Sequence, residues 1–172
     1  MISQGHIDPI WNLDMLAGLK YTRRDLSESK NAGLDIYHWN NIDDRDRYGD
    51  QIALEVADNF EQSLFWKLDP WPDLQNKFIV IHQMRPGMIQ PIHGDLYRRY
   101  SKNNNITDIE TIKRVLIFLT DWHPGHVFHC ADRSYDNWRA GDWVQWSGTT
   151  PHMAGNFGSE LRYTMQITGF AQ

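Results

Sequence analysis

The sequence predicts a mainly β protein, a barrel-like jelly roll with a helical layer packed against it from the N-terminal side. Two observations carry this prediction. After Pro72 the chain is a series of short runs rich in β-branched and aromatic residues, separated by turn residues. Between residues 77 and 170 no second clear helical pattern separates these runs, as a parallel α/β fold would require.

The part before residue 70 carries one apolar pattern with helical spacing. The residues that recur every four positions are Ile52, Val56, Phe60 and Leu64. Such spacing places apolar side chains on one face of a helix. We therefore expect a helix that begins near Asp50 as N-cap and ends before Pro70.

Seven runs in the second part are predicted to form strands, and Tyr135–Trp138 is a weaker eighth. The seven are Phe78–Met84, Met88–His93, Ile112–Thr120, His126–Ala131, Asp142–Trp146, Thr149–Ala154 and Leu161–Phe170. Turn residues such as Pro86-Gly87 separate them. The asparagine-rich segment Ser101–Asp108 is predicted to be a mobile loop between two strands.

Length and composition favour one globular domain. The chain has 172 residues, so we expect a single domain from 1 to 172, with residues 1–75 as mainly helical support and residues 76–172 as the β core. Apolar residues make up 41%, which is typical of a globular rather than a disordered chain. A formal net charge of −5 disfavours bulk nucleic acid as a partner.

Cysteine use and hydropathy favour a cytoplasmic protein with no membrane partner. Cys130 is the single cysteine, so no intrachain disulfide is available and a reducing compartment is expected. No apolar run approaches the roughly 20 residues of a membrane span. Residues 1–20 lack the apolar run of an export signal. The sequence leaves the oligomeric state open.

Three residues have the types and spacing of a metal site. His93 and Asp95 lie two apart, so both side chains point to one face at the end of a strand. His152 follows after enough chain for further strands to return it to the same place. Two histidines and one carboxylate leave coordination positions open, which is the arrangement of non-haem Fe(II) oxygenases. A surface histidine beside a turn-forming aspartate is the structural alternative.

A candidate anion clamp follows the second histidine. Arg162 comes ten residues after His152, and Thr164 follows it. In a strand, Arg162, Thr164 and Gln166 share one face. A guanidinium there is suited to bind a carboxylate through two parallel hydrogen bonds, with the threonine hydroxyl as an extra donor. The alternative is a strand-end arginine in a surface ion pair.

In this order and spacing, the chain resembles the Fe(II)- and 2-oxoglutarate-dependent oxygenases, in particular their prolyl-hydroxylase-like branch. The matching pattern is His93-Gly94-Asp95, then His152, then Arg162-Tyr163-Thr164. The Pro86-Gly87 turn, the run 114–121 and Gly141-Asp142 also resemble that branch. The resemblance covers roughly residues 78–170.

The resemblance implies a double-stranded β-helix, a cupin-like jelly roll. It implies that Fe(II) is bound by His93, Asp95 and His152, and that the cosubstrate 2-oxoglutarate is held by Arg162 and Thr164. The implied activity is that of a dioxygenase that uses O2 to hydroxylate a small molecule or a side chain, with release of succinate and CO2. It implies no catalytic residue beyond the metal ligands, and the intact carboxylate at position 95 favours hydroxylation over halogenation.

The segment after the first two ligands is the first candidate for substrate contacts. Arg98 and Arg99 lie in the segment 96–108, directly after Asp95. Loops on a rigid β scaffold commonly carry specificity. We therefore expect Arg98 and Arg99 to contact substrate, on a segment that orders when substrate binds.

Three alternatives remain open from the sequence. The first is a zinc site among His123, His126, His129 and Cys130, although Pro124-Gly125 opposes the helix that would align His126 with His129. The second is a cupin-like metalloenzyme that does not use 2-oxoglutarate. The third is a non-catalytic jelly-roll binding module.

Overall fold

The computed structural model describes residues 2–26 and 51–171 of the chain. The strands are β1 (Ser3–His6), β2 (Thr22–Asp25), β3 (Ala53–Ala57), β4 (Gln75–Met84), β5 (Ile89–His93), β6 (Ile112–Phe118), β7 (His126–Cys130), β8 (Arg133–Tyr135), β9 (Asp142–Ser147), β10 (His152–Asn156) and β11 (Arg162–Phe170). The helices are α1 (Leu13–Ala17), α3 (Arg98–Asn104) and the 3-10 helices η4 (Gln62–Leu64) and η5 (Ile109–Thr111).

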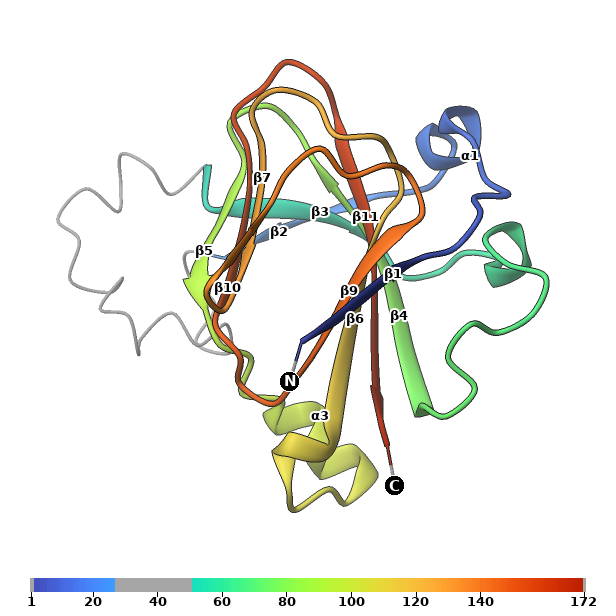
Figure 1. The fold of residues 1–172 in the computed structure, drawn as a ribbon, viewed down its shortest axis with the longest axis vertical. Helices are drawn as coiled ribbons and strands as arrows, with labels where there is room; N and C mark the ends of the chain where they lie inside the picture. The colour runs from blue at the N-terminus through green and yellow to red at the C-terminus, as the bar shows by residue number, and fades with distance from the viewer. Residues whose placement is uncertain (1, 27–50, 172) are drawn as a thin grey trace, which may run out of the picture.

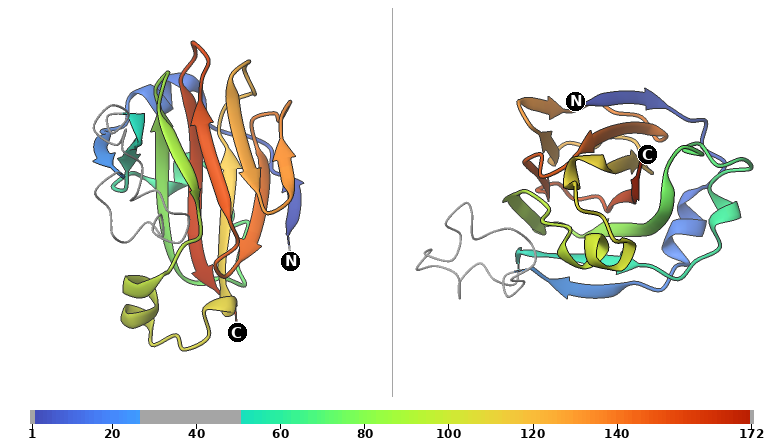
Figure 2. Two further views of the ribbon diagram at one scale, coloured as in Figure 1. Left: turned by 90° about the vertical axis from the view of Figure 1, so that its left-hand side faces the viewer. Right: turned by 90° about the horizontal axis from the view of Figure 1, so that it is seen from below.

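These strands form two antiparallel sheets (Figure 1). The seven-stranded sheet has the order β1-β9-β6-β11-β4-β3-β2, and the four-stranded sheet has the order β5-β10-β7-β8. Seen from below, the strands surround a closed interior, and α3 lies at the lower end of the barrel (Figure 2). The protein is therefore mainly β, with the double-stranded β-helix architecture predicted from the sequence.

Each face of the large sheet has its own apolar cluster. The interior cluster combines Leu116 and Trp146 of the large sheet with Phe128 and Ala154 of the small sheet. The outer cluster lies beneath the N-terminal segments and combines residues such as Ile117 and Met165 with Trp11 and Leu16. Odd-numbered residues of β11 therefore point outward, and the even-numbered ones, beginning with Arg162, point into the barrel.

The predicted helix between Asp50 and Pro70 is wrong in the part that the structure describes. Residues 53–57 form β3, which pairs with both β2 and β4. Of the four evenly spaced residues only Val56 lies in β3, and because four is also a multiple of the strand period of two, its position fits a strand face as well as a helix face. Hydrogen-bonded pairing with β4 stabilises the strand in preference to the helix. Asp50, the predicted N-cap, lies outside the described residues.

The predicted helical layer is much smaller than expected. In the described part of residues 1–75, helix is confined to α1 and η4, while β1, β2 and β3 extend the large sheet. α1 begins at Asn12, whose side chain accepts a hydrogen bond from the backbone N–H of Met15 at 3.0 Å. It buries Leu16 completely in the outer cluster. The expectation of a mainly helical region is therefore wrong for the part of residues 1–75 that the structure describes.

The predicted loop Ser101–Asp108 is wrong over its first half, because residues 98–104 form α3. Its asparagines support the helix end. Asn105 adopts a left-handed conformation (φ 55°) as C-cap, and its N–H bonds the carbonyl groups of Ser101 and Lys102. The Asn104 side chain donates to the carbonyl of Tyr100 at 2.9 Å. The local composition therefore encodes a helix terminus.

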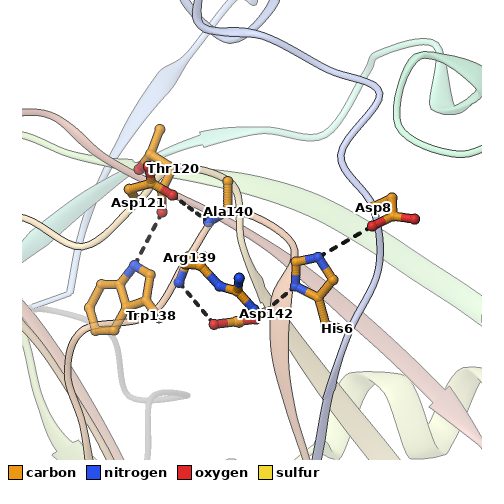
Figure 3. Close-up of polar contacts among 8 residues, drawn as sticks. All are labelled: His6, Asp8, Thr120, Asp121, Trp138, Arg139, Ala140 and Asp142. Carbon is orange, nitrogen blue, oxygen red and sulfur yellow. Dashed lines mark hydrogen bonds and ion pairs between the residues drawn. The ribbon is translucent and has the colours of Figure 1, made fainter.

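The turn before β9 holds the side chain of Trp138, a member of the interior cluster, through hydrogen bonds drawn in Figure 3. The indole N–H of Trp138 donates to the carbonyl of Thr120 at 3.2 Å, and the backbone N–H of Ala140 donates to Asp121 at 2.8 Å. These bonds fix the ring of Trp138, whose face lies 5.5 Å from the guanidinium carbon of Arg162. The turn therefore helps to position a residue of the candidate site.

The first strand is attached at the same turn. Asp142 lies 2.7 Å from Nδ1 of His6 and accepts a hydrogen bond from the backbone N–H of Arg139 (Figure 3). Gly141 is required here, because its φ is +92° and a Cβ would lie 2.0 Å from the carbonyl oxygen of Ile7. The contact between His6 and Asp142 therefore joins β1 to the start of β9.

Among the described residues, no helix has the length and apolar character needed to cross a membrane.

Candidate metal centre

Two histidines and one aspartate converge between β5 and β10. One ligand atom from each of His93, Asp95 and His152 lies within 4.8 Å of the others. His93 ends β5, His152 begins β10, and the two residues are direct partners in the antiparallel ladder. Among the described residues, this is the one group of three potential ligand side chains that comes together. The structure thus brings together the three predicted ligands.

Hydrogen bonds to the backbone fix both imidazole rings. Nδ1 of His93 lies 2.7 Å from the carbonyl oxygen of Pro91, and Nδ1 of His152 lies 3.0 Å from that of Thr150. A carbonyl oxygen only accepts, so Nδ1 carries the proton and donates in both rings. Nε2 of each neutral ring then has a lone pair, which is the tautomer that binds a metal through Nε2.

Gly94 allows the ligand pair to pack against the chain that leads into β10. A Cβ at position 94 would lie 2.6 Å from the carbonyl oxygen of Thr149. Any side chain there would push the segment that carries His93 and Asp95 away from the segment that carries His152. The glycine between the first two ligands therefore has a steric role in bringing the third ligand close.

Arg114 orients the carboxylate of Asp95. Its Nη1 lies 2.6 Å from Oδ2 of Asp95, and its guanidinium carbon lies 5.1 Å from the centre of the Tyr97 ring. Burial raises the pKa of Asp95, but Arg114 and then His152 outweigh burial, and the pKa of this carboxyl falls below its usual value. Asp95 is therefore ionised, as a metal ligand must be.

The histidines of the centre are neutral at physiological pH. Burial, followed by the proximity of His93, lowers the pKa of His152 to about 3. Burial also lowers the pKa of His93. A third histidine, His82 on β4, faces the same interior, and burial followed by Arg114 lowers its pKa to about 3. The unprotonated rings are ready to bind a cation without losing a proton.

These shifts predict a marked loss of stability of the metal-free protein in acid. In the unfolded chain His82 and His152 take up protons near pH 6.5, whereas in the folded chain they do so near pH 3. The contribution of these two histidines to the free energy of unfolding is therefore fully present above about pH 6.5. Below it, each histidine lowers the free energy of unfolding by about 1.4 kcal/mol per pH unit. Urea denaturation with EDTA at pH 7.5, 6 and 5 measures this slope.

The variant His82→Gln isolates one of these contributions, because His82 is not one of the candidate ligands. Its slope below pH 6.5 should be smaller by about 1.4 kcal/mol per pH unit. A matched control is His129→Gln, at a partly exposed position whose side chain bonds Ser134. An unchanged slope in His82→Gln would show that this histidine is protonated in the folded protein.

Arg162 is a buried cation without a carboxylate partner in the described part of the chain. It is 2% exposed, its Nη1 donates to Sδ of Met84 at 3.3 Å, and its Nε and Nη2 have no hydrogen-bond partner among residues 2–26 and 51–171. Its guanidinium carbon lies near the faces of Trp138 and Phe118. Burial lowers the pKa of Arg162 to about 9. A buried charge without a counter-charge is costly, so an anion is the natural complement of this position.

Thr164 lies on the same inner face, as the alternation along β11 predicts. A small cavity is lined by Arg162, Thr164, His152 and Met84, among others. Its volume is about 10 Å³, which is the room for a single water molecule. The predicted cosubstrate residues therefore line the same small cavity as His152 of the candidate metal centre. Side chains fill most of the interior around this cavity.

Arg98 and Arg99 lie in the first turn of α3, which follows Asp95 in the chain. Both line a cavity of about 810 Å³ that also contains Asp95 and Arg114. The structure thus places the predicted substrate residues next to a candidate metal ligand. They lie on a helix and not on a loop, so the predicted ordering of a loop by substrate does not apply to residues 98–104.

The alternative zinc site finds no support in the described part of the chain. On β7, His126 and Cys130 point inward, while His129 is on the opposite face and bonds Ser134. His126 donates through Nε2 to the carbonyl of Glu160 at 3.1 Å. Burial raises the pKa of Cys130 to about 12, so its thiol stays protonated and is a poor ligand.

Three residues of the site were not predicted from the sequence. They are Arg114 beside Asp95, His82 on the inner face of β4, and Gln90, whose amide nitrogen lies 3.1 Å from Nε2 of His93. A signal existed for Arg114, since it is a charged residue within the apolar run 112–119. Nothing local distinguishes Gln90 or His82 from polar residues on an exposed strand face.

Comparison with known proteins finds only solved structures of low similarity. The chain matches no family model, and no curated protein matches it. Similar solved structures include a predicted oxalate decarboxylase from Thermotoga maritima, with 14% identity over 69% of this chain and 81% of that chain and a TM-score of 0.44. A Klebsiella pneumoniae protein with a double-stranded β-helix domain has 13% identity over 58% and 72% (TM-score 0.40). The Schizosaccharomyces pombe Cnp3 cupin domain has 12% over 68% and 61% (TM-score 0.42).

Proposed function

We propose that the protein is an Fe(II)- and 2-oxoglutarate-dependent dioxygenase that hydroxylates an organic substrate. His93, His152 and Asp95 would hold the iron, since two imidazoles and one carboxylate with open positions are the donor set of such centres. The two Nδ1 hydrogen bonds and the Arg114 ion pair support the fit, because they preset all three donor groups.

The observation that carries the proposal is the buried guanidinium of Arg162. An enzyme that binds only a metal and a neutral substrate has no use for an unpaired cation in its interior. A dicarboxylate with one carboxylate at the metal and the other at Arg162 complements both charges. The Thr164 hydroxyl lies on the same wall and would donate to the same carboxylate.

Bound together, Fe(II), 2-oxoglutarate and O2 supply the oxidation, in which one oxygen atom enters the substrate and the other enters succinate as CO2 is released. The chain's own residues bind, orient and exclude water. Asp95 and the two histidines hold the metal, Arg162 sets the direction of the cosubstrate, and Phe128 and Trp146 keep the interior dry.

Binding of the cosubstrate requires a change in the interior, because the cavity beside Arg162 has a volume of only about 10 Å³. Met84 is the side chain placed to move. It contacts the guanidinium directly, and a methionine has three rotatable bonds and adapts its shape at low cost. We therefore expect Met84 to turn away from Arg162 when a carboxylate takes its place.

The same small volume favours a second candidate, a metalloenzyme with this jelly roll that does not take 2-oxoglutarate. In that case the substrate would reach the metal from the 810 Å³ cavity beside Asp95, and Arg162 would remain in contact with Met84. The two candidates share the metal centre and differ in whether 2-oxoglutarate binds.

Incubation of the wild-type protein with Fe(II), 2-oxoglutarate and air tests the choice. The proposal predicts slow formation of succinate without added substrate, followed by NMR, and its loss with EDTA. Binding of 2-oxoglutarate is measured in parallel without oxygen, so a slow uncoupled reaction is not mistaken for an absent cosubstrate. If 2-oxoglutarate neither binds nor is consumed, the second candidate replaces the first.

A further inference from the structure

The cavity of about 810 Å³ beside Asp95 is strongly basic for a chain with formal net charge −5. Five basic residues and two acidic residues line it. Its size suits a small organic ligand. Its lining comes from α3, the first residues of β4, Arg114 of β6 and the second half of β11, together with Asp95. Figure 1 shows α3 at the lower end of the molecule, where β6 begins and β11 ends. A ligand there would be next to Asp95.

The wall of this cavity contains buried polar groups without partners. Nε of Arg114, the hydroxyl of Tyr97 and Oγ1 of Thr168 have no hydrogen-bond partner among the described residues. Arg114 and Tyr97 are each 8% exposed, and Thr168 is 3% exposed. A buried polar group without a partner costs about 1–3 kcal/mol, so three along one cavity indicate a ligand that accepts hydrogen bonds.

Two cations stand at the rim without an ion pair. Arg24 is paired with Asp58 at 3.2 Å, and Lys77 is paired with Asp69. By contrast, Arg98 and Arg99 are exposed and have no ion pair among the described residues. The first turn of α3 therefore presents two unpaired guanidinium groups to the cavity that Arg114 reaches from β6.

We propose that this cavity binds a small organic anion, through an acid group held by Arg114, Tyr97 and Thr168 with Arg98 and Arg99 closing over it. Guanidinium and hydroxyl donors favour carboxylate and phosphate oxygens, and the excess positive charge attracts such a ligand. That this anion is the molecule oxidised at the metal rests on the proposed function. The binding of the anion itself does not.

Ligand-observed NMR tests the proposal on the 172-residue chain in EDTA at low ionic strength. The probes are benzoate, phenyl phosphate and, as a neutral molecule of similar size, benzyl alcohol. The wild type should bind one or both anions and not the alcohol, and the two anions distinguish a carboxylate from a phosphate site. Loss of charge-assisted hydrogen bonds in Arg98→Ala/Arg99→Ala should weaken anion binding by about 10-fold or more.

Three variants give the result its specificity. Arg133→Ala/Arg139→Ala removes the same charge from exposed residues outside the cavity and should leave the affinity unchanged. Tyr97→Phe removes a single buried hydroxyl and should weaken binding by about 3- to 10-fold. Arg162→Ala should bind the anion as the wild type does, whatever its effect on 2-oxoglutarate.

Two results would overturn the proposal. One is that neither anion binds the wild type. The other is that Arg162→Ala abolishes binding while Arg98→Ala/Arg99→Ala retains it, which would move the anion to the interior behind the metal centre. Because metal and 2-oxoglutarate are absent from this assay, failure of the dioxygenase proposal would leave its outcome unaffected.

Discussion

His152→Ala should abolish the tight binding of Fe(II) and all turnover while leaving the fold intact. The substitution removes one of three donors whose ligand atoms lie within 4.8 Å of one another. Loss of an outer partner of a ligand commonly costs 10- to 100-fold in affinity, so loss of the ligand itself should cost at least about 100-fold. Anaerobic Fe(II) titration gives the affinity, and circular dichroism reports the fold.

His129→Ala is the matched control for this variant. It removes an imidazole from β7, on the face opposite to the barrel interior, so Fe(II) affinity should be unchanged. Because His152 is neutral and buried, His152→Ala should also make the metal-free protein less sensitive to acid. Full iron affinity in the double variant His93→Ala/His152→Ala would refute the assignment of the ligands.

Arg162→Ala should weaken the binding of 2-oxoglutarate by at least about 100-fold. A carboxylate left unpaired in a largely dry interior loses several kcal/mol, and each 1.4 kcal/mol is a factor of ten. Arg162→Lys keeps the charge and loses the planar fork, so it should raise the KM for 2-oxoglutarate more than it lowers kcat. Calorimetry of 2-oxoglutarate with the Fe(II)-loaded variants under nitrogen measures the affinity.

Two comparisons make this second result specific. Arg139→Ala removes an exposed arginine from the turn before β9 and should bind 2-oxoglutarate as the wild type does. Thr164→Val removes only the hydroxyl beside Arg162 and should have a smaller effect, about 3- to 10-fold. An affinity unchanged in Arg162→Ala would place the cosubstrate elsewhere, and Arg114 would be the next arginine to test.

The β core and the convergence of His93, Asp95 and His152 were predictable because their signals are local or strictly periodic. The turns at Pro86-Gly87 and Ala140-Gly141 separate runs that do form strands. As their two-residue spacing predicts, the side chains of His93 and Asp95 lie close together at the end of β5. Alternation along β11 correctly places Arg162 and Thr164 inside and Met165 outside.

The remaining features depend on contacts between distant segments. The residues of β3 have a spacing that fits a helix and a strand equally well, and pairing with β4 selects the strand. Arg114 belongs to the site because β6 places it beside Asp95, which lies 19 residues earlier in the sequence. The short α3 is stabilised by its C-cap and by Asn104, whose side-chain oxygen accepts a hydrogen bond from the amide of Asn76, 28 residues earlier. Each of these contacts joins segments that are far apart in the sequence, so a local sequence pattern does not reveal them.

The most direct test of the account is anomalous diffraction at the iron edge from crystals grown without oxygen in Fe(II) and 2-oxoglutarate. We predict one iron peak within coordination distance of Nε2 of His93, Nε2 of His152 and the carboxylate of Asp95. We also predict 2-oxoglutarate density that joins this iron to the guanidinium of Arg162, with Met84 turned aside. Iron at another site, or 2-oxoglutarate away from Arg162, would contradict the account.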